Sequence, residues 1–199
     1  VDSSYGSNGY KTFPANSRYN ITSLVANDDE SITVGGYGGN GLESVPSFLT
    51  FTRDGLQIIT SFNYSVGQPN PGYGSKNIDA KNAMINGQER IVFAYALPIN
   101  TNDQYRIAIA SLSATTGAGG EQLMHTPWLG SEFVSAEPTC IITLPGNGGF
   151  IVPGNARRTN GSLVGIVFTY THTGNLDPAF ASHGVRIITG HSVGPHWNS

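Results

Sequence analysis

The stretch Arg90-Ile91-Val92-Phe93 is the middle one of three short apolar runs that begin 59 residues apart. The other two runs are Ser31-Ile32-Thr33-Val34 and Gly149-Phe150-Ile151-Val152. Each is followed by a turn and by a second, alternating run, at residues 48–52, 107–111 and 166–170. β-Branched and aromatic residues at this spacing predict three β-hairpins, and the constant offset predicts a tandem repeat of about 59 residues.

The composition agrees with an all-β chain. Only 23 of the 199 residues are charged, while 26 are Gly and 11 are Pro, which leaves few charges for helix surfaces and supplies many turns. The net charge of −3 comes without a cluster of Lys and Arg, so we do not expect nucleic acid as a partner. No run approaches the roughly 18 to 20 apolar residues of a membrane span, and we predict none.

The two ends of the chain match each other. Residues 1–11 align without a gap to residues 176–186, an offset of 175, with Asp, Ser and Gly identical at three places. We therefore predict one repeat domain over residues 1–199. Its approximate units are 1–58, 59–118 and 119–176, and residues 177–199 repeat the start of the first unit.

The segment Gly174-Asn175-Leu176-Asp177-Pro178-Ala179-Phe180-Ala181-Ser182-His183-Gly184-Val185 resembles the signature of delta-60 repeat proteins, approximately Gly-x-Leu-Asp-x-Ser-Phe-Gly-x-x-Gly-Val. The first copy, from Asp2 to Gly9, keeps a Ser and a Gly that the last copy replaces with Ala179 and Ala181. The inner junctions, residues 57–63 and 121–128, have largely lost the signature. The resemblance implies a β-propeller-like fold of three four-stranded blades that serves as a recognition scaffold. In the turn that the signature forms, the Asp side chain would accept hydrogen bonds from backbone amides. The aromatic residue would anchor the turn on the blade, and Gly would supply positive φ.

Three blades are fewer than the 4 to 8 with which propellers close. The chain would then be a fragment or an oligomer, and we favour a head-to-tail homodimer that completes a six-bladed ring. A β-sandwich or an open barrel built from the same hairpins is the alternative fold.

The sequence offers little for catalysis. Gly190-His191-Ser192-Val193-Gly194 matches the nucleophile elbow of serine hydrolases, but Pro195 replaces the start of the required helix and His196 is the only titratable side chain that follows. We predict no catalytic residue and lean against an enzyme, with a serine hydrolase as the remote alternative. Glu89 beside Arg90 indicates a surface ion pair.

No metal or cofactor is predicted. His183, His191 and His196 are separated by eight and five residues, which matches no standard zinc spacing. The single cysteine, Cys140, is expected to occupy a buried strand position.

Aromatic residues in loop-like, Gly- or Pro-flanked segments are the candidate ligand-binding residues, because a sugar ring stacks on such rings while its hydroxyls take polar partners. They are Tyr37, Tyr64, Tyr73, Trp128 and Trp197. The alternative is that they pack between sheets. We therefore expect a carbohydrate-binding recognition module, or alternatively a protein-binding or adhesive scaffold. The low charge and sparse Lys favour an extracellular or periplasmic location.

Overall fold

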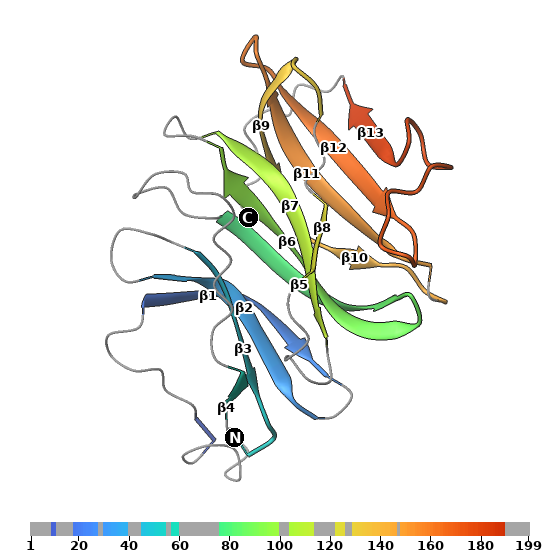
Figure 1. The fold of residues 1–199 in the computed structure, drawn as a ribbon. Coiled ribbons are helices and arrows are strands. Elements are labelled where there is room, and N and C mark those ends of the chain that lie inside the picture. The colour runs from blue at the N-terminus through green and yellow to red at the C-terminus, as the bar shows by residue number, and fades with distance from the viewer. Residues whose placement is uncertain are drawn as a thin grey trace.

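The computed structural model describes residues 9–10, 18–27, 30–39, 45–54, 57–59, 76–99, 104–113, 122–125, 129–146 and 148–189. Within these residues every regular element is a β-strand, so the prediction of an all-β chain is confirmed. The strands form three separate antiparallel sheets, and none of them closes into a barrel (Figure 1).

Each sheet is built from consecutive strands. The first sheet has the order β1 (Arg18–Ala26), β2 (Ile32–Gly39), β3 (Val45–Phe51), β4 (Gln57–Ile59). The second has the order β5 (Lys76–Ile85), β6 (Gln88–Pro98), β7 (Tyr105–Ser113), β8 (Gln122–His125). The third has the order β10 (Ile142–Thr143), β11 (Phe150–Arg158), β12 (Leu163–Tyr170), β13 (Val185–Ile188), and β9 (Phe133–Pro138) also pairs with β11.

The three predicted hairpins are present. Thr33 pairs with Thr50, Val92 with Ser111, and Ile151 with Thr169. The first members of these pairs are 59 residues apart, whereas the intervals between the second members are 61 and 58. The distance along the chain from a residue to its partner therefore differs between the hairpins, which indicates that the connecting loops differ in length.

The second sheet lies between the other two (Figure 1). Alternate residues of β6 belong to different cores: Phe93 is in the same buried cluster as Val25 of the first sheet, whereas Val92 is in the cluster that contains Phe150 of the third. Both Val92 and Phe93 are 0% exposed. Because side chains alternate along a strand, a strand covered on both faces needs a continuous apolar run, which explains Ile91-Val92-Phe93-Ala94-Tyr95-Ala96.

Hydrogen bonds link neighbouring sheets directly. Asp79 Oδ2 accepts a hydrogen bond from the backbone N–H of Ile141 at 2.7 Å, and Ser135 Oγ accepts one from the N–H of Tyr105 at 3.0 Å. Both bonds join the second sheet to the third. These bonds satisfy backbone donors at the sheet junctions, where an unpaired donor would be costly.

The prediction of a loop around Tyr37 is wrong. Residues 35–39 continue β2, and the backbone of Tyr37 pairs with Asn20 on one side and Pro46 on the other. Pairing on both sides outweighs the low strand preference of glycine. A side chain at Gly36 would collide with the backbone of Asn20, so glycine is required here by a close approach of two strands.

The expectation for Cys140 is also corrected. The residue is half-buried and lies in the connection between β9 and β10, outside both strands. Its neighbour Ile141, at 2% exposure, takes the buried position instead. The local apolar run indicated burial correctly but assigned it to the wrong residue, because the strand is interrupted between Pro138 and Ile142.

The terminal copy of the signature leads into the third sheet. Residues 185–188, which begin with the last residue of the signature, form β13. They pair with β12, and Val185 lies opposite Phe168. Within the described residues, β13 is the outermost strand of that sheet, opposite β10.

Candidate functional site

Most of the predicted ligand-binding residues lie outside the described part of the chain. These are Tyr64, Tyr73, Trp128 and Trp197. For Tyr37 the structure gives the backbone position in β2 and no side-chain environment. The serine motif at residues 190–194 and the histidines His191 and His196 also lie outside the described residues. A ligand role for these aromatic residues stays a prediction.

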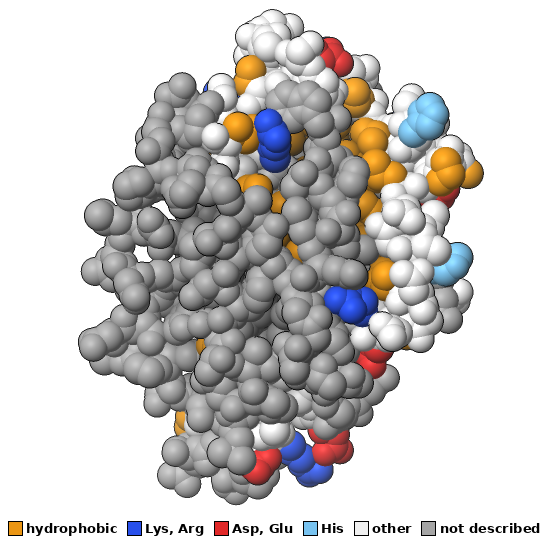
Figure 2. Space-filling view, viewed as in Figure 1, with side chains coloured by type: hydrophobic (Ala, Val, Ile, Leu, Met, Phe, Trp, Pro, Cys, Tyr) orange, Lys and Arg blue, Asp and Glu red, His pale blue; other side chains and the backbone are white. Residues whose placement is uncertain are grey.

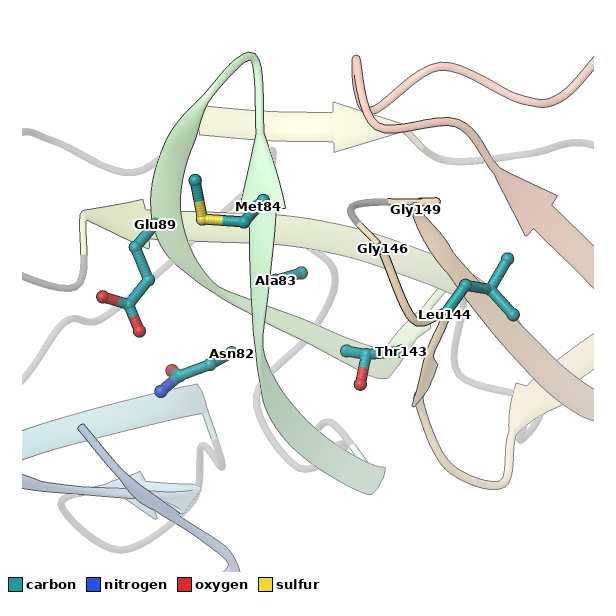
Figure 3. Close-up of a pocket in the computed structure, with 8 residues that line it drawn as sticks. All are labelled: Asn82, Ala83, Met84, Glu89, Thr143, Leu144, Gly146 and Gly149. Atoms are coloured by element: carbon teal, nitrogen blue, oxygen red, sulfur yellow. The ribbon is translucent and has the colours of Figure 1, made fainter. Parts of the chain in front are cut away.

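A pocket of about 320 Å³ opens where the second sheet meets the third (Figure 3). One side is formed by the β5–β6 hairpin and the other by β10 and the turn that leads into β11. Its lining residues are Asn82, Ala83, Met84, Glu89, Thr143, Leu144, Gly146 and Gly149. The site therefore depends on two different sheets.

The turn between β10 and β11 is shaped by glycine. Leu144 donates its N–H to the carbonyl of Gly149 at 2.9 Å, which closes the turn, and Gly149 has a φ of +95°. A Cβ at Gly149 would collide with the carbonyl of Tyr170. Only glycine fits both the positive φ and this close approach, so the backbone itself forms part of the pocket wall.

Asn82 is held in place by the first sheet. Its Nδ2 donates to the carbonyl of Ala26 at 3.1 Å. Its Oδ1 is buried and accepts no hydrogen bond from the protein. The amide is therefore fixed against the first sheet, and its enclosed oxygen is not open to a group that enters the pocket.

Glu89 and Thr143 add further polar atoms. Glu89 pairs with Met84 across the β5–β6 hairpin, whereas Thr143 reaches the pocket from the third sheet. In Figure 3 the side chains of Asn82, Met84 and Glu89 project from one side of the β5–β6 hairpin, and Thr143 lies on the other side of β5. A carboxylate, a hydroxyl and apolar atoms in one pocket lining favour a ligand that carries hydrogen-bond donors on a compact frame.

Sequence reasoning missed this pocket. Glu89 was interpreted as half of a surface pair with Arg90, but the two residues are consecutive in β6 and lie on opposite faces of the sheet. The Arg90 guanidinium instead donates to Ser111, with Nε 2.8 Å from Oγ. No sequence pattern joins Glu89 to Thr143, because they meet only through the packing of two sheets.

A second pocket, of about 460 Å³, lies beside the terminal signature turn. It is lined by Leu129, Ala181, Ser182, Val185, Arg186 and Ile187. The turn has the geometry that its signature predicted: Asp177 Oδ1 accepts a hydrogen bond from the N–H of Ala179 at 2.9 Å, and Gly184 has a φ of +86°. Among its described lining residues Arg186 is the only charged one, so this pocket offers fewer directional partners than the first.

Chemistry that needs clustered ionisable groups is not visible in the described part of the chain. Across those residues, no three His, Cys, Asp or Glu side chains come together to hold a metal ion. Where the structure is described, it also has no helix with the length and apolar character needed to cross a membrane.

No family model matches the chain, and no curated protein matches it significantly. The resemblance to delta-60 repeat proteins therefore depends on the two junction motifs alone.

Proposed function

We propose that the protein is a non-enzymatic recognition module that binds a carbohydrate in the pocket between the second and third sheets. The observation that carries this proposal is the pocket lining, to which Glu89 contributes a carboxylate, Thr143 a hydroxyl and Met84 an apolar side chain. Sugar hydroxyls are the complementary donors, and the C–H groups of a sugar ring are the complementary apolar surface.

We further propose that the three sheets are blades of a β-propeller-like assembly in an extracellular or periplasmic protein. Two observations support the blade interpretation: each sheet is made of consecutive antiparallel strands, and the sheets pack in chain order. In such an assembly a ligand site at a sheet junction can recur, and several weak sites would bind a displayed glycan by avidity.

The test is a glycan array with the full chain displayed multivalently, followed by calorimetry with the best sugar. Glu89→Gln and Thr143→Ala should each weaken binding about 10-fold, the effect of roughly one lost hydrogen bond. Thr139→Ala, an exposed threonine outside the pocket, is the matched control and should bind like the parent protein.

Binding that survives both substitutions would place the sugar elsewhere and overturn the site. If the array shows no binding to any sugar, the carbohydrate proposal is wrong, and the protein-binding scaffold becomes the better interpretation.

A further inference from the structure

Successive sheets pack by a fixed rule. We call the side of a sheet that faces the next sheet in the chain its forward face, and the other side its rear face. The second sheet places Val92, Ala94, Ile107 and Ile109 forward, against Phe150, Val152, Ile166 and Phe168 on the rear of the third. It places Ile91, Phe93, Ala108 and Ala110 on its rear, where Val25 of the first sheet packs.

The 59-residue offset identifies matching positions on the third sheet. Val92 and Ala94 correspond to Ile151 and Pro153, so Ile151 and Pro153 lie on the forward face of the third sheet. Val92 and Ala94 are 0% exposed, whereas Ile151 and Pro153 are only half-buried. The third sheet thus keeps apolar residues at two of these packing positions, whereas Ala96 corresponds to the exposed Asn155, and no described sheet lies in front of this face.

Three large apolar side chains on this forward face are exposed to solvent. The register places Ile142 opposite Ile151, Leu163 opposite Arg157, and Ile188 opposite Gly165, all on the same side of the sheet. Their exposures are 50% for Ile142, 70% for Leu163 and 54% for Ile188. Figure 2 shows hydrophobic side chains at the surface in the region where Figure 1 places the third sheet. An apolar surface of this kind is characteristic of an interaction site.

On the rear face of the first sheet, residues that correspond to buried positions of the second sheet are exposed or half-buried. Leu24 pairs with Val34, just as Ala80 pairs with Phe93 one unit later. Ala80 and Phe93 are 0% exposed, whereas Leu24 is 60% exposed and Val34 is half-buried. Farther across this face, Leu49 and Phe51 are already buried, so the uncovered part lies over β1 and β2.

We propose that the forward face of the third sheet in one molecule packs against the rear face of the first sheet in a second molecule. The occupant is a second copy of this chain because both surfaces are repeats of surfaces that already pack together twice within the chain. Such a contact is head-to-tail, and two of them close a pair of molecules into a ring of six sheets.

Sedimentation velocity and light scattering on the full chain test the proposal. The parent protein should be a dimer at micromolar concentration. Leu24→Glu, on the rear face, and Ile142→Glu, on the forward face, should each weaken dimerisation at least 100-fold, since each buries a carboxylate in two symmetric contacts. Both side chains are exposed in the single chain, so thermal melting followed by circular dichroism should show that the two variants still fold.

A mixture of the two variants separates this contact from other arrangements. Mixing Leu24→Glu with Ile142→Glu brings one unmodified forward face against one unmodified rear face, so partial dimerisation should return. Thr159→Glu, in an exposed turn off both faces, is the charge control and should remain dimeric. A monomeric parent protein overturns the proposal, and so does a dimer that survives Leu24→Glu. Either result leaves the carbohydrate proposal unaffected.

Discussion

The carboxylate of Asp79, on β5, accepts a hydrogen bond from the backbone N–H of Ile141 across the junction between the second and third sheets, at 2.7 Å. Its other oxygen accepts one from the N–H of Ala80 at 2.9 Å. The Asp79 side chain is 19% exposed, so both bonds are formed largely out of water. One side chain thus fixes the edge of its own sheet and the position of the next.

Replacing Asp79 should loosen this junction. Asp79→Ala removes the acceptor for two backbone donors, and we expect the free energy of unfolding to fall by about 1 to 3 kcal/mol. Asp79→Asn keeps one carbonyl oxygen and should lose less. Urea denaturation measures both effects, with the exposed Thr139→Ala as control. Equal losses for Asp79→Ala and the control would show that the bond to Ile141 contributes nothing.

The signature turn contains a residue in an unfavourable conformation. Ala181 stands where the delta-60 signature has glycine, and its φ is +45°. Ala181→Gly should raise stability by about 0.5 to 1 kcal/mol, because it relieves the left-handed strain at some entropic cost. Ala179→Gly, in the same turn but without a positive φ, should lower stability instead. Thermal unfolding distinguishes the two, and a destabilised Ala181→Gly variant would contradict the strain argument.

Two glycines of the pocket turn should respond differently to a methyl group. Gly149→Ala places Cβ against the carbonyl of Tyr170 and should cost about 2 kcal/mol or more. Gly146 has a φ of +65° but open space around its Cβ position, so Gly146→Ala should cost only about 1 kcal/mol of left-handed strain. Chemical denaturation of both variants measures the difference, and similar costs would refute the predicted collision.

Stability should fall at alkaline pH because of Tyr170. Its ring stacks on Phe150 with centroids 4.6 Å apart, and burial raises the pKa of Tyr170 above its ordinary value of about 10. Above that pH the unfolded chain releases the phenol proton while the folded chain keeps it. The contribution to stability is therefore complete below about pH 10 and is lost as the pH rises further.

The comparison with Tyr170→Phe isolates this effect. The variant should lose stability less steeply between pH 10 and 11.5, by about 1.4 kcal/mol per pH unit for one proton. Denaturation midpoints across this range give both slopes. Identical slopes in the two proteins would show that Tyr170 is not the group responsible.

The strands could be predicted from the sequence more reliably than the pocket. The strands containing Val92, Thr33 and Ile151 were located correctly, because β-branched and aromatic residues in alternating runs specify a strand locally. Tyr37 was assigned wrongly because its glycine neighbours suggest a loop, and only the two flanking strands keep that stretch extended. The pocket at Asn82 and Thr143 was not foreseen, since its halves come from different units.

The sequence by itself determined the all-β class and the 59-residue spacing of the first strand of each hairpin, because both follow from residue patterns along the chain. The tertiary structure decided what the patterns could not express: which face of each sheet packs forward, where the pocket opens, and that Asp79 binds Ile141, a residue 62 positions away. The physical reason is that a strand pattern records which side chains are buried but does not identify the surface that buries them. That surface is specified only when the sheets pack together.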